Sequence, residues 1–232
     1  GQVTVVEIMG RHAGWLAGSA ALATKFGSGP DFVYLPEIDF DMDRFIEDIS
    51  RVYNEKKSAF VAVSEGIHYA DGSFVSEAKT SATDGFGHAQ LGGLAALLTD
   101  KVKRVTGAKV RGIELSLLQR SAAHLASKTD LDEAFMAGKV AVESAINGET
   151  GKMVAFQRDT SDGKYVCKTK LVPLGEVANL EKKVPREWIN EAGNNVTDDF
   201  INYVLPLIQG EPERATEYSL PRYARLKKVL AK

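Results

Sequence analysis

The sequence predicts an α/β protein: a doubly wound, Rossmann-like and largely parallel sheet with helices on both faces, followed by an irregular C-terminal extension. Short apolar runs alternate with segments of helical period through the first 150 residues. Strands that alternate with helices of this length form parallel sheets covered on both faces. After Met153 the pattern changes to two strand-like runs around a turn. We therefore expect an α/β portion over residues 1–150, and strands and a helix over residues 151–232 that complete the fold.

Each element is predicted from an apolar run or from helical spacing. In the first portion the expected strands are 3–8, 32–35, 60–63 and 110–115. The expected helices there are 13–22, 41–53, 87–105, and one that begins at 129 or 130 and ends at 147. Asp41 is expected to cap the second helix, and Asp130 with Glu133 to form a capping box on the fourth. In the second portion, strands at 153–156 and 166–171 flank an Asp-Gly turn, and a helix covers 197–208.

The composition of the chain narrows the classes of protein to which it can belong. A net charge of −2 and a pI near 6.2 argue against a nucleic-acid partner, which would need a basic stripe. The single cysteine, Cys167, excludes an internal disulfide and any multi-cysteine metal site. No apolar run approaches the 18 residues of a membrane span, and no signal peptide is present, so we expect no membrane partner and a cytoplasmic location.

Candidate binding residues follow the predicted strands. Met9, Gly10 and Arg11 come directly after the first strand, and Glu65 comes after the third. Arg111 lies within the fourth strand, and two further candidates, Gln119 and Arg120, follow it. Ligands of open parallel sheets bind beyond the carboxyl ends of the strands. Glycine permits close approach to the backbone, a helix N-terminus offers N–H groups, and arginines grip phosphate. These residues suit a phosphorylated, hydroxyl-bearing ligand; the alternative is that the three arginines are ordinary surface charges.

Three other patterns in the sequence are weaker indications of function. Ala62 to Gly66 resembles the nucleophile elbow of a serine hydrolase centred on Ser64, but a polar loop follows where the elbow needs a helix. Gly85-Phe86-Gly87 lacks the third glycine of a dinucleotide fingerprint. The four histidines are scattered without the spacing of metal ligands, so no metal site is expected among them.

Several motifs together resemble the 6-phosphofructokinase family. They are VVEIMGRHAGWLA from Val5, YLPE from Tyr34, VAVSEG from Val61, and LLQRSAAHLAS from Leu117 followed by TDLDEAFMAGKVAVESAINGETG. AHLASKTD and DDFINYVLPLIQGE look most like the pyrophosphate-dependent branch and its close ATP-using relatives. The resemblance implies a cytoplasmic glycolytic phosphotransferase that uses Mg²⁺, with pyrophosphate or ATP as donor, to phosphorylate fructose 6-phosphate at its 1-hydroxyl.

The resemblance also assigns roles. Met9, Gly10 and Arg11 match the family's sugar-phosphate motif, and Glu65 matches a glutamate that contacts the sugar. Arg111 matches an arginine that reaches across a subunit interface, which implies a homodimer or homotetramer. Gln119 and Arg120 match the end of the sugar-phosphate loop, with Arg120 on the 6-phosphate. Two positions depart from the family: Leu117 replaces a usual tyrosine or histidine, and Gln2 replaces an arginine.

The family's donor-binding Gly-Gly-Asp motif and its catalytic Thr-x-Asp-x-Asp motif do not occur in these 232 residues. In the family both lie upstream of the opening segment. We therefore expect no catalytic residue in this chain, Mg²⁺ held mainly by the missing N-terminal half, and an isolated chain that is inactive. The alternative is a non-catalytic sugar-phosphate-binding regulatory subunit. The apolar faces of the helices are expected to pack against the absent half, so their exposure predicts that copies of the isolated chain associate.

Overall fold

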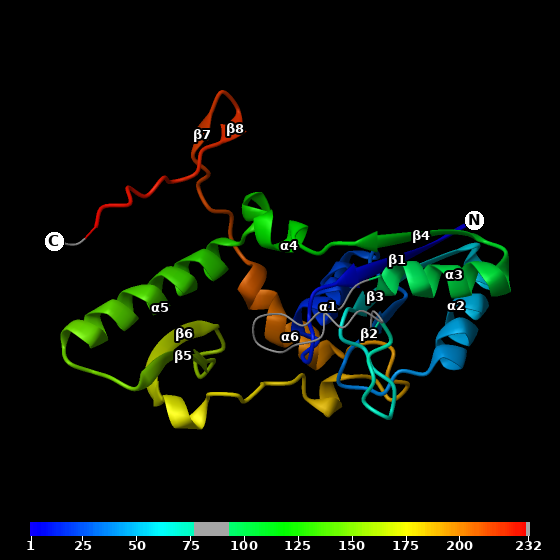
Figure 1. Cartoon of the computed structure of the whole chain (residues 1–232), viewed down its shortest axis with the longest axis horizontal. Coiled ribbons are helices and arrows are strands. Elements are labelled where there is room, and N and C mark those ends of the chain that lie inside the picture. The colour runs from blue at the N-terminus through cyan, green and yellow to red at the C-terminus, as the bar shows by residue number, and fades with distance from the viewer. Residues whose placement is uncertain (77–92, 231–232) are drawn as a thin grey trace. The chain divides into compact units, whose positions relative to one another are not determined.

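A parallel sheet of four strands organises the computed structural model, which describes residues 1–76 and 93–230 (Figure 1). The strands are β1 (Gln2–Ile8), β2 (Phe32–Tyr34), β3 (Ser58–Ser64) and β4 (Lys109–Glu114), in the spatial order β2-β3-β1-β4. Every pairing between neighbours is parallel. The two central strands, β1 and β3, are apolar on both faces, as a covered parallel sheet requires.

Helices cover both faces of this sheet. Val3 and Val5 face a cluster that contains α2 (Met42–Lys56) and α3 (Leu94–Thr106). Val6 and Ile8, which alternate with them along β1, face a second cluster that contains α1 (Trp15–Ser19) and α6 (Asp198–Val204). Successive side chains of a strand point to opposite faces, so this alternation fixes which helix covers which face. The predicted doubly wound α/β fold is confirmed.

Helix boundaries follow local chemistry. Asp41 caps α2 as predicted, because its Oδ1 accepts the backbone N–H groups of Asp43 and Arg44. The capping box predicted for α5 (Lys128–Ile146) is wrong: the helix begins at Lys128, before the expected start, and Ser127 is its cap, with its Oγ accepting the N–H of Asp130. α3 begins after Gly93; the expected start near residue 87 lies outside the described residues.

The remaining elements are short. The predicted strands of the C-terminal portion form an antiparallel hairpin of β5 (Lys152–Asp159) and β6 (Val166–Pro173). A second hairpin pairs β7 (Thr216–Glu217) with β8 (Leu220–Pro221). The helical turns are α4 (Leu118–Ser121), η1 (Ala20–Phe26), η2 (Ala123–Leu125), η3 (Leu174–Glu176), η4 (Arg186–Trp188) and η5 (Leu205–Ile208). α1 and α6 each continue into a 3₁₀ turn, η1 and η5, so the predicted helices at 13–22 and 197–208 are α-helical only in part.

The chain forms two compact units. Unit 1 comprises residues 1–120 and 175–205, and unit 2 comprises residues 121–174 and 206–232. This division does not follow the predicted boundary at residue 150, because residues 175–205 pack with the sheet. The backbone N–H of Val33 donates to the carbonyl of Asn194 at 2.8 Å, and α6 completes the second core cluster. Among the helices of the described ranges, none is both long and apolar enough to cross a membrane.

Candidate functional site

The loops that follow β1, β3 and β4 meet at the carboxyl edge of the sheet. The backbone N–H of Glu65 donates to the carbonyl of Ile8 at 2.8 Å, and that of Leu115 donates to the carbonyl of Glu7 at 3.1 Å. These bonds continue the parallel ladders by one residue beyond the ends of the strands. They place the loop after β1 between the other two. This is the edge at which an open parallel sheet binds its ligands.

Gly10 is the centre of this edge. Its N–H donates to Oε1 of Glu65 at 3.2 Å, and its carbonyl accepts the hydroxyl of Ser64. Its φ angle is +151°, and a Cβ there would lie 2.8 Å from the carbonyl oxygen of Ala13. Only glycine adopts this conformation without strain. The predicted neighbours Gly10 and Glu65 therefore lie in direct contact.

Gly66 brings the loop after β3 against the loop after β1. A Cβ on Gly66 would lie 1.7 Å from the carbonyl oxygen of Arg11, so no side chain fits between the two backbones. The contact involves main chain on both sides, which cannot move aside as a flexible side chain could. Gly66 therefore allows the backbone of Arg11 to lie directly against the loop after β3.

Gln119 joins the same edge from the loop after β4. Its Oε1 accepts the N–H of Met9 at 2.7 Å, although the two residues are 110 positions apart in the sequence. An amide that accepts through its oxygen keeps its NH₂ group as a donor. The structure therefore brings together four of the predicted residues, Met9, Gly10, Glu65 and Gln119.

The backbone donors of this edge are already bonded, which corrects one expectation. The sequence predicts free N–H groups at the start of the first helix, and a ligand that contacts the backbone at Met9 and Gly10. In the structure the N–H of Gly14, the N-cap of α1, donates to Oε1 of Glu37 at 2.9 Å. The N–H groups of Met9 and Gly10 are bonded to Gln119 and Glu65. Nearby side chains reach these donors because the loops pack closely, so an anion here would depend on arginine side chains.

Arg11 and Arg120 adjoin this set of bonded residues in the sequence. Arg11 is half-buried and directly follows Gly10, whereas Arg120 is exposed and directly follows Gln119. Within the described ranges neither guanidinium forms a salt bridge. No carboxylate of the described ranges therefore competes with an anionic ligand for either charge.

Arg111 lies away from these residues within one chain. It pairs in register with Thr4 of β1, five residues before Met9. With a rise of about 3.3 Å per residue, Arg111 lies roughly 16 Å along the strand from the level of Met9. β4 is an edge strand, and Arg111 is exposed on it. Within one chain Arg111 therefore does not join the four bonded residues.

Glu7 is a buried carboxyl next to the site that the sequence reasoning missed. Its side chain is 3% exposed, and Oε2 accepts the N–H of Ala95 in the first turn of α3 at 2.8 Å. Burial raises the pKa of Glu7, the bond from Ala95 lowers it, and the carboxylates of Glu114 and Glu65 raise it further. The available signal was a single acid in an apolar strand, Val-Val-Glu-Ile.

The geometry does not support a serine nucleophile at Ser64. Its side chain is fully buried, and its hydroxyl donates to the carbonyl of Gly10. In the same loop, Nδ1 of His68 faces the carbonyl of Gly66 at 3.4 Å. Of the histidines in the described ranges, none forms a hydrogen bond to Ser64, so the base that a nucleophile needs is not in place there.

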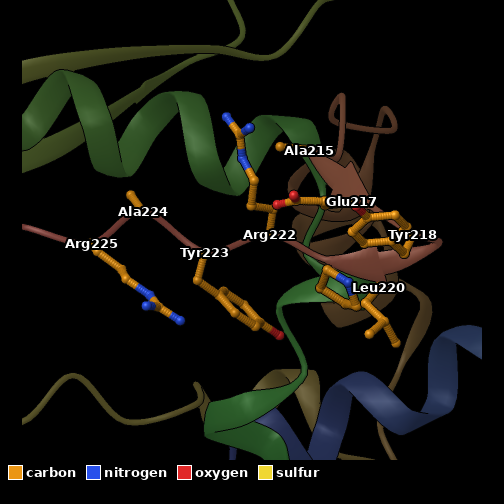
Figure 2. Close-up of a pocket in the computed structure, with 9 residues that line it drawn as sticks. Ala215, Glu217, Tyr218, Leu220, Arg222, Tyr223, Ala224 and Arg225 are labelled. Carbon is orange, nitrogen blue, oxygen red and sulfur yellow. The ribbon is translucent and has the colours of Figure 1, made fainter.

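A cavity of about 810 Å³ lies in unit 2, and none of the predicted binding residues lines it. It is lined by the β7–β8 hairpin and the chain that follows (Figure 2). Arg222 extends to one side of the backbone, whereas Tyr223 and Arg225 extend to the other (Figure 2). Because the cationic groups diverge, this cavity lacks a convergent anion site.

The comparisons with known proteins agree with the fold and with the motifs at this edge. The sheet and its bonded loops define a protein of the doubly wound α/β class with a ligand edge built from β1, β3 and β4. The family model "Phosphofructokinase" matches residues 1–145. The chain belongs to the phosphofructokinase family.

Two named relatives are similar to this chain over nearly its whole length. The chain is 42% identical to a pyrophosphate–fructose 6-phosphate 1-phosphotransferase of Halomonas elongata over 98% of its own length, and 43% identical to one of Xanthomonas campestris over 98%. The crystal structure of a pyrophosphate-dependent phosphofructokinase from Marinobacter aquaeolei superposes with a TM-score of 0.83 at 34% identity, covering 99% of this chain. The match covers 54% of each of these three proteins, so the chain spans about half the length of its relatives.

Proposed function

We propose that this chain provides the fructose 6-phosphate site of a pyrophosphate-dependent phosphofructokinase. The observation that carries the proposal is the hydrogen-bonded set at the carboxyl edge: Met9 with Gln119, and Gly10 with Glu65. This set joins three loops that are distant in sequence, and the arginines that directly follow two of its members form no salt bridge with another described residue. The names of the relatives support both the sugar phosphate and the pyrophosphate donor.

The chemistry of the residues suggests how each would act. The Arg120 and Arg11 guanidiniums would hold the 6-phosphate by charge-assisted hydrogen bonds. The Glu65 carboxylate would accept hydrogen bonds from sugar hydroxyls, and the NH₂ group of Gln119 would donate to a sugar or phosphate oxygen. The close contact of Gly66 with Arg11 would keep these groups in place before the ligand arrives.

Phosphoryl transfer itself needs groups that this edge does not supply. Within residues 1–76 and 93–230, no cluster of three or more His, Cys, Asp or Glu side chains could hold a metal ion. These residues therefore do not fit a Mg²⁺ site, and we derive no step through the metal. We infer that Mg²⁺, the donor and the base for the 1-hydroxyl belong to the part of the relatives that the chain does not span. ATP in place of pyrophosphate, or a purely regulatory sugar-phosphate subunit, would use the same acceptor residues.

Arg111 would complete the site of a second copy in a homodimer or homotetramer. Its position on the exposed edge strand, roughly 16 Å from the level of Met9, supports this role. Arg111→Ala should therefore weaken binding of fructose 6-phosphate only at protein concentrations where copies associate. Equal weakening in a dilute, monomeric sample would contradict the role across an interface.

Titration calorimetry with fructose 6-phosphate tests the proposal. Arg120→Ala should reduce affinity by about tenfold or more, because a charge-assisted hydrogen bond contributes about 1.5–3 kcal/mol. Arg104→Ala is a matched control, since Arg104 is an exposed arginine of α3 whose partner is Asp100. Equal heats for wild type and Arg120→Ala would overturn the assignment. Glucose 6-phosphate, tested in parallel, separates recognition of the fructose from recognition of the phosphate.

A further inference from the structure

Glu37 joins three segments of unit 1 through one oxygen atom. It follows β2, and its Oε1 accepts the backbone N–H of Gly14 and that of Val184, each at 2.9 Å. Gly14 lies 23 positions before Glu37 in the sequence, and Val184 lies 147 positions after it. The other oxygen, Oε2, is buried and has no partner among the described residues. The hydrogen bonds of this carboxylate therefore serve the two N–H groups alone.

Glu37 supplies a helix cap that the local sequence lacks. Gly14 is the N-cap of α1 and offers no side chain for capping. In a capping box, a Glu or Gln three residues later accepts the N–H of the N-cap, but in α1 that position is Ala17. Glu37 accepts this N–H from a different loop. A Cβ on Gly14 would lie 2.8 Å from Oε2 of Glu37, so glycine is needed for the close approach.

A second bond holds the start of α1 against the same part of the 175–205 segment. The indole Nε1–H of Trp15, the residue after Gly14, donates to the carbonyl of Lys182 at 2.6 Å. The Lys182 ammonium lies 5.9 Å from the centre of the Trp15 ring. Val184, which Glu37 holds, is two residues further along the segment. The start of α1 therefore cannot slide along the segment without breaking both connections.

The loop between β1 and α1 is thus held at both of its ends. At its start, the N–H of Gly10 is bonded, and the backbone of Arg11 lies directly against Gly66. At its end, Gly14 is bonded to Glu37. Arg11 lies between these two connections, three residues before Gly14. The direction in which its side chain leaves the backbone therefore depends on both of them.

We propose that Glu37 is a positioning residue for Arg11. It acts without contact to the ligand: it fixes the end of the loop and so keeps the Arg11 guanidinium where the phosphate of a sugar phosphate binds. An apparent dissociation constant rises as the binding-competent conformation becomes less populated, so a loop released at one end binds more weakly. The inference rests on the proposed function, in which Arg11 contacts the 6-phosphate.

A double-mutant cycle, measured by calorimetry with fructose 6-phosphate, tests this role. Glu37→Ala should weaken binding by about fivefold or more. Glu47→Ala, at an exposed position of α2, is the matched control and should leave binding unchanged. In a chain that already carries Arg11→Ala, the further change Glu37→Ala should weaken binding by less than about twofold, because no guanidinium remains to be positioned. A residue that only stabilised the fold would weaken binding equally in both backgrounds.

Rescue by a conservative variant and amide hydrogen exchange give two further readouts. Glu37→Gln keeps an oxygen acceptor of the same reach, so its affinity should stay within about threefold of wild type. Exchange of the Gly14 and Val184 amides, measured without ligand, should accelerate about tenfold in Glu37→Ala and much less in Glu37→Gln. If circular dichroism shows that Glu37→Ala is unfolded, Glu37→Asp replaces it in the cycle, because its carboxylate is one methylene shorter.

The outcomes separate this role from the proposed function. Equal affinity of wild type and Glu37→Ala, equal weakening in the two backgrounds, or no rescue by Glu37→Gln would overturn the role of Glu37 and leave the proposed function standing. Unchanged exchange of the Gly14 amide would overturn it as well. Absence of binding to the wild-type chain would instead overturn the proposed function, and this role with it.

Discussion

The carboxylate of Glu7 accepts the backbone N–H of Ala95 at 2.8 Å, so an acid buried in β1 holds the first turn of α3. An acid in this position interacts favourably with the helix N-terminus, but its ionised form loses hydration. Burial is the larger effect, because the pKa of Glu7 is raised above its ordinary value of 4.5. Two further carboxylates, on Glu114 and Glu65, oppose its charge.

Glu7→Gln should stabilise the protein at neutral pH. A folded-state pKa above the unfolded one means that the folded protein binds the proton more tightly. Stability conferred by protonated Glu7 is therefore complete below about pH 4.5 and is lost as pH rises through the raised pKa. Glutamine can accept a hydrogen bond from the Ala95 N–H without a charge, so the stability of the variant should not decline as pH rises. Urea unfolding between pH 4 and 8, followed by the fluorescence of Trp15 and Trp188, measures it. Glu55→Gln, at an exposed position of α2, is the control; parallel curves for Glu7→Gln and wild type would contradict the prediction.

Gly66→Ala should disrupt the site and destabilise the fold together. The new Cβ would meet the carbonyl oxygen of Arg11 at 1.7 Å, and relief requires two backbone segments to separate. Overpacking of this kind costs about 1–3 kcal/mol, and main-chain displacement places the cost near the upper end. Urea unfolding and fructose 6-phosphate calorimetry should both show the loss. Gly138→Ala in α5 has open space and should instead stabilise its helix by up to about 1 kcal/mol; similar behaviour of the two variants would contradict the close contact.

Phe200→Ala should release the 175–205 segment from the sheet. Phe200 is fully buried, stacks on Trp15 with ring centroids 5.8 Å apart, and lies directly over Gly18. Truncation of a buried phenylalanine costs about 3–5 kcal/mol. The midpoint of urea unfolding should fall, with a change in Trp15 fluorescence even before denaturant is added. Phe26→Ala, at an exposed position, should change stability by no more than about 0.5 kcal/mol; a comparable loss there would show that aromatic content alone, not burial, decides the effect.

The parallel sheet could be predicted because each of its strands is a short apolar run that can be recognised from the local sequence. The apolar runs that contain Val3, Val5, Val61 and Val63 are typical of strands covered on both faces. The start of α2 could be predicted because the side chain of Asp41 can cap a helix. The same logic placed the loops after β1 and β3 at one edge of the sheet. The contact of Gly10 with Glu65 follows directly from that topology.

The features that could not be predicted depend on distant partners. Met9 and Gln119 are 110 residues apart, and no local pattern indicates that an amide oxygen takes the backbone donor. The division into units also depends on long-range bonds, such as that from the N–H of Val184 to Oε1 of Glu37 at 2.9 Å. Periodicity reports which face of a segment is apolar, but it does not report which other segment covers that face.

The two faces of the sheet become complete at different times during synthesis on the ribosome. The buried residues of the cluster that contains α2 and α3 lie no later than Ala108, whereas the opposite cluster needs Phe200, Ile201 and Val204. At 5–20 residues per second, roughly 90 residues of further translation leave that second face covered only in part, by α1, for about 5–20 s. The nascent chain would leave Val6, Ile8 and their neighbours incompletely covered throughout this interval. A half-covered sheet of this kind is a natural substrate for a chaperone that binds apolar strands before the C-terminal residues arrive.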